Sequence, residues 1–142
     1  KSRCLIFKIS LTFNESLNIS NSILEKNVLK FVNYDLLSYY NSPGEIISLF
    51  NFADEKSINL KDHTISSFIN LIIENNYYKK NKPIKILLIN LIQLFLLKKF
   101  MMTETKISLI NFYHKFIKKI HDTEIFNLDE ESLFLEFKSK LL

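Results

Sequence analysis

Apolar side chains recur along most of the chain at the three- and four-residue spacing of an amphipathic helix, and residues that favour helix starts separate the runs. This pattern predicts seven helices. The first stretch also alternates as a strand would, so a strand is its alternative. The expected helices cover residues 2–13, 20–40, 43–57, a segment capped by Asp62, residues 83–100, a segment capped by Thr103 and a segment capped by Asp129.

The clearest local signal is the helix start at Ser42-Pro43-Gly44-Glu45. A serine before a proline at the first helical position, with a glutamate three residues after the serine, is typical of a capping box. We expect the Ser42 hydroxyl to accept from the Glu45 amide while the Glu45 carboxylate reaches back to the Ser42 amide.

Residues 83–100 form the most apolar stretch of the chain. A helix that is apolar nearly all round has to be enclosed by its neighbours, so a buried central helix is predicted here. Its continuous apolar part, Ile84–Leu97, contains Lys85, Asn90 and Gln93 and falls short of the roughly twenty residues that a membrane span needs. We therefore expect no membrane span.

The composition narrows the fold class. The 142 residues include one Gly, two Pro and thirteen Phe, and 47 % of them are apolar. Turns of β-hairpins depend on Gly and similar residues at positive φ, so a fold with a single Gly is expected to be all-α. Gly44 cannot form a Gly-rich phosphate loop alone, and Cys4 has no second cysteine for a disulfide. These features favour a protein that is not an enzyme.

A weak internal repeat appears at an offset of 42 residues. Leu49 falls on Leu91, which falls in turn on Leu133, and Phe50 falls on Ile92. Two-helix units of this kind bury their apolar faces only against one another. We predict stacked antiparallel helical hairpins, a short α-solenoid-like fold of about seven helices, as one domain over 1–142 or part of a longer helical-repeat array. The expected hairpins are 42–82, 83–122 and part of a third, 123–142.

The segment from Ser42 to Ala53, followed by Ile58–His63, resembles the helical hairpins of heptatricopeptide and octotricopeptide repeat proteins. In those families a short helix that ends in a small residue precedes a linker and a longer second helix. They are similar to pentatricopeptide proteins, and in apicomplexans they are organellar proteins that bind RNA or sit in the mitochondrial ribosome. The resemblance covers residues 42–120 and departs from pentatricopeptide repeats in length and in lacking their Gly. It implies a mitochondrial role with RNA.

Basic residues gather in three places that suit an anionic partner, and the net charge of the chain is +4. Lysines neutralise phosphates without reading sequence, and tyrosines stack on bases. Because eighteen of the nineteen basic residues are Lys, the alternative for each cluster is an ordinary solvated face. The candidate nucleic-acid contacts are Tyr77, Tyr78, Lys79, Lys80 and Lys82 in the first cluster, Lys98 and Lys99 in the second, and Lys115, Lys118 and Lys119 in the third.

Metal and catalytic sites are not expected. His114 and His121 are seven residues apart, nearly two helical turns, which is too far for both to bind one metal ion. Glu130 and Glu131 are consecutive and face different directions, unlike a catalytic carboxylate pair. His63 follows the expected cap Asp62 and is interpreted as a surface residue. We predict no cofactor and no metal.

The leading hypothesis is a non-catalytic helical-repeat scaffold that is RNA-associated or is a structural component of an organellar ribonucleoprotein such as a mitochondrial ribosome. Its partners would be RNA or a ribonucleoprotein, together with proteins of a larger assembly. The alternative is a protein-interaction helical bundle, such as a viral Bcl-2-like module, with Ile84–Leu97 as its central helix. A third option is a subunit fragment that works only in a larger complex, which also suits a chain that begins at Lys1.

Overall fold

The structure is a computed structural model that describes residues 11–38, 41–79, 81–102, 106–126 and 130–141. Every regular element in these ranges is helical, which confirms the all-α fold class. The described residues form seven α-helices and one short 3-10 helix. The chain divides into two compact units, residues 1–61 (unit 1) and residues 62–142 (unit 2), where the sequence pattern predicts one domain.

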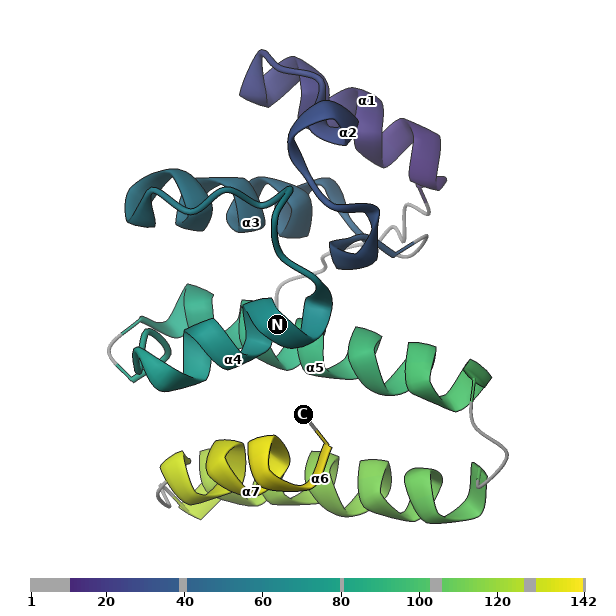
Figure 1. The fold of residues 1–142 in the computed structure, drawn as a ribbon, viewed down its shortest axis with the longest axis vertical. Helices are drawn as coiled ribbons and strands as arrows, with labels where there is room; N and C mark the ends of the chain where they lie inside the picture. The colour runs from purple at the N-terminus through teal and green to yellow at the C-terminus, as the bar shows by residue number, and fades with distance from the viewer. Residues whose placement is uncertain (1–10, 39–40, 80, 103–105, 127–129, 142) are drawn as a thin grey trace, which may run out of the picture. The chain divides into compact units, whose positions relative to one another are not determined.

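Unit 1 contains α1 (Phe13–Leu24), α2 (Val28–Phe31), the 3-10 helix η1 (Tyr34–Leu36) and α3 (Pro43–Lys56) (Figure 1). α1 begins with a capping box, in which the Thr12 hydroxyl accepts from the Glu15 amide and the Glu15 carboxylate accepts from the Thr12 amide. It ends at Glu25, whose φ of 53° is left-handed. The single helix predicted over 20–40 is therefore wrong. Most of the helix predicted over 2–13 lies outside the described residues.

Asparagine side chains explain why residues 20–40 do not form one helix. The Asn21 Oδ1 atom accepts from the Val28 amide at 2.8 Å, and the Asn33 Oδ1 atom accepts from the Asp35 amide at 2.9 Å. Such acceptors compete with the backbone hydrogen bonds of a continuous helix. The chain therefore turns after α1, and its apolar residues reach the core from two short helices instead of one long one.

α1 packs against α3, and two small side chains lie on the buried side of α1. Ser16 and Ser20 are 2 % and 0 % exposed. The Ser20 hydroxyl donates to the Ser16 carbonyl oxygen at 2.8 Å, so its hydrogen bond is made within the helix. Because serine is small and this hydroxyl is satisfied, α1 can present a close-packed surface at this point.

The predicted start of α3 is confirmed. The Ser42 hydroxyl accepts from the Glu45 amide at 3.3 Å, and the Glu45 carboxylate accepts from the Ser42 amide at 2.8 Å. The helix ends where the pattern predicts, with Ser57 as its C-cap at a φ of 55°. Its buried residues are Ile46, Leu49, Phe50, Phe52 and Ala53.

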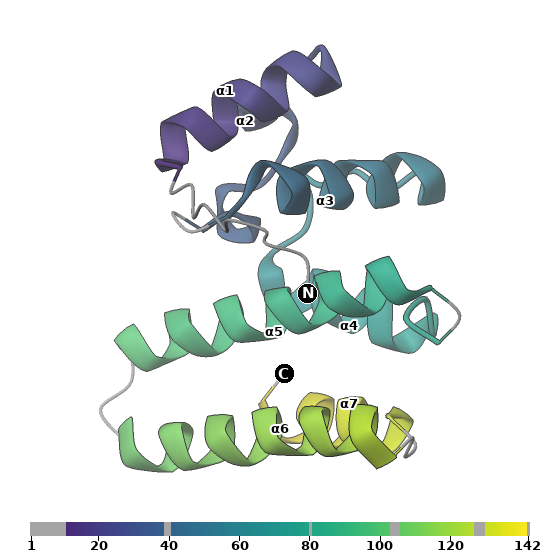
Figure 2. The same cartoon turned by 180° about the vertical axis from the view of Figure 1, so that it is seen from behind.

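Unit 2 contains α4 (Ile65–Glu74), α5 (Lys82–Met102), α6 (Lys106–Phe126) and α7 (Glu131–Leu141). The four helices run in alternating directions, and α4 and α6 each contact both α5 and α7 (Figure 1; Figure 2). The last helix of the unit thus packs back against the first. Thr64, and not the predicted Asp62, caps α4, because its hydroxyl accepts from the Ser67 amide at 3.3 Å. The predicted caps Thr103 and Asp129 lie outside the described residues.

Aromatic rings from three helices meet in the centre of unit 2. Phe137 of α7 is 0 % exposed. Its ring centroid lies 5.8 Å from that of Phe95 in α5, and 5.4 Å and 6.4 Å from those of Phe116 and Phe112 in α6. These separations are typical of favourable aromatic packing, so Phe137 packs α7 against α5 and α6.

The apolar side predicted for α4 is buried in full and comprises Ile65, Phe68, Ile69, Ile72 and Ile73. α5 differs from its prediction because it is not enclosed on all sides. Ile86 and Leu97 are 49 % and 47 % exposed, which leaves one side of α5 open to solvent. Among the described residues, no helix combines the length and the apolar character that crossing a membrane requires.

Burial in α3, α5 and α7 follows the 42-residue spacing. The recurring buried positions are Leu49, Phe50 and Ala53, then Leu91, Ile92 and Phe95, then Leu133, Phe134 and Phe137. α4 and α6 do not follow it, because Ile65 is buried whereas Ile107, 42 residues later, is 78 % exposed. The boundary between the units falls inside the predicted hairpin 42–82. The repeat and the stacking of hairpins into a solenoid therefore stay predictions.

Candidate nucleic-acid interface

Charge is distributed unevenly along unit 2. Ten of the nineteen basic residues lie between residues 75 and 121, and Glu104 is the only carboxylate side chain in that stretch. Residues 122–142 carry six acidic residues against two lysines. The three predicted lysine clusters all belong to this basic stretch, which covers α5 and most of α6. The uneven charge along the sequence therefore indicates that the three clusters are parts of one basic stretch.

Glutamates in and directly before α7 neutralise part of the basic stretch. The pairs are Lys79 with Glu131 at 2.6 Å, Lys85 with Glu130, and Lys119 with Glu136 at 2.5 Å. A fourth pair joins Lys138 of α7 to Glu74 of α4 at 2.7 Å, and the hydrogen bond from Lys138 lowers the pKa of Glu74. These contacts hold α7 on its neighbours. Lys79 and Lys119, two of the predicted nucleic-acid contacts, are thus engaged within the chain.

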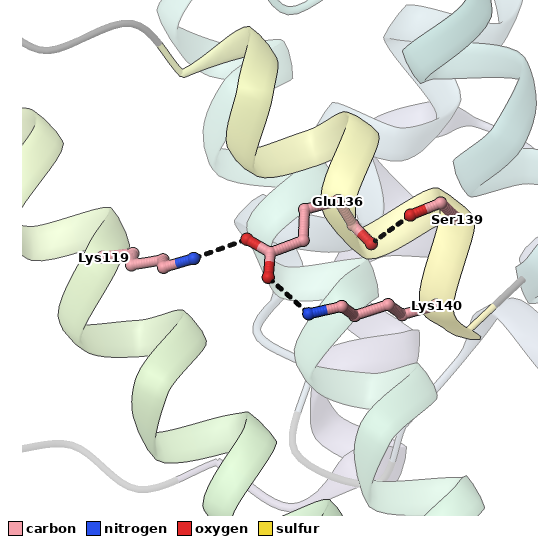
Figure 3. A network of polar contacts seen from close by, with 4 residues as sticks. All are labelled: Lys119, Glu136, Ser139 and Lys140. Atoms are coloured by element: carbon pink, nitrogen blue, oxygen red, sulfur yellow. Dashed lines mark hydrogen bonds and ion pairs between the residues drawn. The ribbon is translucent and has the colours of Figure 1, made fainter.

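Glu136 binds two lysines at once (Figure 3). Its carboxylate lies 2.5 Å from Lys119 of α6 and 2.7 Å from Lys140, one turn further along α7. The hydrogen bonds from Lys119 and Lys140 lower the pKa of Glu136 from 4.5 to about 2. Both lysine side chains are more than half exposed, so water screens the attraction. The network therefore contributes less than about 1 kcal/mol to stability.

The Glu136→Gln variant is expected to weaken the response of unit 2 to acid. Because the pKa is lower in the folded state, the carboxylate stabilises the fold fully above pH 4.5, and this contribution is lost as the pH falls toward 2. Across that window the free energy of unfolding should fall further for the wild type than for the variant, by less than about 1 kcal/mol. Urea unfolding at several pH values measures the difference, and identical pH profiles would contradict it.

In the link before α5, one of the two tyrosines predicted to stack on bases is not accessible. Tyr78 is 3 % exposed, and its ring lies edge-on to Phe134 with centroids 4.7 Å apart. The prediction that Tyr78 stacks on a base is therefore corrected: its ring belongs to the core of unit 2. Tyr77 is half-buried, Lys82 is exposed, and Lys80 lies outside the described residues.

Lys98 and Lys99 lie one turn before the end of α5, and both are half-buried. The Lys99 ammonium sits 5.0 Å from the centroid of the Phe95 ring, a cation–π distance. Lys82 begins the same helix, so at 1.5 Å per residue the first two clusters are about 25 Å apart along its axis. The structure does not bring these two clusters together.

Among the predicted contacts outside the ion pairs with the α7 region, Lys82, Lys115 and Lys118 are exposed, and Lys115 and Lys118 lie together on α6. Both are exposed on α6, and no described carboxylate forms an ion pair with either of them. Asn111, His114 and His121 are exposed as well and lie seven, four and three residues from Lys118, which places them on the same side of α6. We call these five residues the α6 stripe. Only its lysines are predicted from the sequence, although the helical period from Asn111 to His121 could have identified the other three residues.

The histidines are spread over two helices. Nδ1 of His63 lies 3.4 Å from the Ser67 hydroxyl at the start of α4, and the rings of His63 and Phe68 are 5.8 Å apart. His114 and His121 lie two turns apart on α6. Within the part of the chain that the structure describes, no group of three or more His, Cys, Asp or Glu is placed to hold a metal ion.

The α6 stripe combines ammonium groups with imidazole and amide side chains along three turns of one helix. Such a surface can neutralise phosphates and donate hydrogen bonds to them, without reading sequence. The resemblance of residues 42–120 to organellar helical-repeat proteins stays a prediction. Comparison of the chain with models of protein families, with curated proteins and with solved structures finds no match.

Proposed function

We propose that this protein is a non-catalytic helical scaffold that associates with RNA, as a component of a ribonucleoprotein. The observation that carries the proposal is the contrast among the lysines of the basic stretch. Lys79, Lys85 and Lys119 are held by glutamates of the α7 region. Lys115 and Lys118 project from α6 without an ion pair to any described residue. The mitochondrial ribosome is the assembly that the family resemblance implies.

Unpaired lysines favour a phosphate partner for an energetic reason. A lysine already paired with a carboxylate must lose that contact before it can bind a phosphate, whereas an exposed lysine without such a pair only displaces counterions from the RNA. Lys115 and Lys118 lie three residues apart, so their ammonium groups can reach neighbouring phosphates from one helix face. His114 and Asn111 add polar groups on the same side. The α6 stripe is therefore expected to bind the RNA backbone.

The alternative of a Bcl-2-like bundle has less support. Such a bundle surrounds one central helix, and α5 is the candidate for it. The exposure of Ile86 and Leu97 leaves one side of α5 uncovered, which differs from an enclosed central helix. An amphipathic helical peptide that binds unit 2 in a titration would nevertheless favour this alternative over RNA.

The double variant Lys115→Glu/Lys118→Glu is expected to lower affinity for single-stranded RNA by at least about tenfold at low salt. It should also reduce the slope of log affinity against log salt by about 1.4, because each phosphate contact on a single strand contributes about 0.7. Fluorescence anisotropy with a labelled RNA oligonucleotide over a series of salt concentrations measures both quantities.

The matched control is Lys30→Glu/Lys61→Glu, which makes the same change of net charge at two exposed lysines of unit 1. The control should lose little affinity and keep the wild-type salt slope. Equal losses in the two double variants would mean that only net charge matters, and salt-independent binding by the wild type would refute the proposal.

A further inference from the structure

Three lysines of α6 lie within about one turn of one another, but they do not share the same surroundings. Lys115 and Lys118 belong to the α6 stripe, and no described carboxylate pairs with either of them. Lys119 follows Lys115 by four residues, so the two side chains are neighbours on the helix surface. Lys119 points to α7, where its ammonium group lies 2.5 Å from the Glu136 carboxylate (Figure 3). Glu136 therefore engages the third lysine of this cluster.

The packing of α7 fixes the position of Glu136. Its neighbours Phe134 and Phe137 are 1 % and 0 % exposed, and the ring centroid of Phe137 lies 5.4 Å from that of Phe116 in α6. α7 cannot move away from α6 without exposing these rings to water, which is unfavourable. Lys140, one turn further along α7, binds the second carboxylate oxygen at 2.7 Å. The carboxylate is therefore a fixed negative charge beside the lysines of α6.

A fixed carboxylate at this place competes with an RNA phosphate for the ammonium group of Lys119. Exposed ion pairs are weak because water screens them, so a phosphate can displace Glu136. The displaced carboxylate then lies close to a phosphate of the same charge, and this repulsion opposes the exchange. Hydrogen bonds from Lys119 and Lys140 lower the pKa of Glu136 to about 2, so the carboxylate stays charged at neutral pH.

We propose that Glu136 limits the RNA affinity of the α6 stripe by competing with RNA phosphates for Lys119. This inference rests on the proposed RNA binding and identifies a residue that regulates its strength. RNA held by Lys115 and Lys118 gains a further phosphate contact only where Glu136 gives up Lys119. Neutralising this one carboxylate therefore extends the RNA-binding surface along α6.

The test is the affinity of Glu136→Gln for a labelled single-stranded RNA oligonucleotide, measured by fluorescence anisotropy over a series of salt concentrations. Glutamine keeps the size of the side chain but has no charge to hold Lys119. Affinity at low salt should rise about fivefold, the upper value for an exposed ion pair. The slope of log affinity against log salt should become steeper by about 0.7, which corresponds to one phosphate contact.

The matched control is Glu55→Gln in unit 1. It makes the same change of net charge and also removes the carboxylate of an exposed ion pair, since Glu55 lies 2.6 Å from Lys56. Because this site is not on α6, the control should change RNA affinity by less than about twofold and keep the wild-type salt slope.

A double-mutant cycle tests whether Lys119 is the lysine concerned. Lys119→Gln in the wild-type chain should weaken RNA binding by about twofold or less, because Glu136 already engages this lysine. In the Glu136→Gln background the same exchange should remove most of the fivefold gain. All variants should keep the wild-type circular dichroism spectrum, because an exposed ion pair contributes little to stability.

The outcomes separate this inference from the proposed function. Equal affinities of Glu136→Gln and Glu55→Gln overturn it, and so does an equal loss from Lys119→Gln in both backgrounds. In either case a loss of affinity in Lys115→Glu/Lys118→Glu would still support RNA binding by the α6 stripe. If neither the wild type nor Glu136→Gln binds RNA, both proposals are overturned.

Discussion

Phe137→Ala is expected to lower the free energy of unfolding of unit 2 by about 3–5 kcal/mol. Phe137 is 0 % exposed and lies among the rings of Phe95, Phe112 and Phe116. Removing its ring leaves a cavity between three helices whose rings cannot all move to fill it. A domain of this size has a total stability of roughly 5–15 kcal/mol, so the change removes a large part of it.

The matched control for Phe137→Ala is Leu135→Ala. Leu135 precedes Phe137 by two residues on α7 and is 50 % exposed, so its loss should cost less than about 1 kcal/mol. Urea unfolding followed by circular dichroism gives both values, and hydrogen exchange should show faster exchange in α5, α6 and α7 for Phe137→Ala. Equal destabilisation by the two variants would mean that the ring cluster is not the centre of unit 2.

Ser20→Leu is expected to destabilise unit 1 by about 1–3 kcal/mol or more. Ser20 is 0 % exposed on the side of α1 that packs against α3, so a leucine there has no room without a shift of the helix. The larger side chain also removes the donor to the Ser16 carbonyl oxygen, at present 2.8 Å away. Thermal unfolding of the variant should begin at a lower temperature than that of the wild type.

Two controls distinguish overpacking from loss of the hydroxyl. Ser22→Leu makes the same exchange two residues later, where the serine is exposed and also donates to a carbonyl oxygen four residues earlier. It should change stability by less than about 0.5 kcal/mol. Ser20→Ala removes the hydroxyl without adding volume and should be well tolerated. If Ser20→Ala were as harmful as Ser20→Leu, the hydrogen bond and not the close packing would be the important feature.

Several parts of the fold follow from short-range physics and were therefore predictable. The capping box of Ser42 and Glu45 involves residues three apart, so any chain with that motif can form it locally. The buried side of α4 follows from the 3.6-residue period alone. The low Gly content predicted the absence of hairpin turns and hence the all-α class.

The predictions of the helix over 20–40 and of the Asp62 cap were wrong because two local signals compete at each of these places. Residues 20–40 have helical spacing of apolar side chains, yet Asn21 and Asn33 accept from backbone amides and interrupt the helix. At α4, Asp62 and Thr64 both resemble N-caps, and the hydroxyl of Thr64 makes the bond. Periodicity reports which side chains can share a face, but it does not decide between alternative acceptors for the same amides.

The sequence by itself determined that the chain is helical, that α3 begins after the Ser42 cap, and that its lysines are concentrated in residues 75–121. Only the tertiary structure decided which lysines stay accessible. Lys79 forms an ion pair with Glu131, 52 residues away in the sequence, and Lys119 forms one with Glu136, 17 residues away. The Tyr78 ring packs in the core against Phe134. These contacts depend on how α7 folds back onto the other helices of unit 2. Local periodicity contains no information about the packing of α7 against these helices, because this packing arises from the burial of side chains that are distant in sequence.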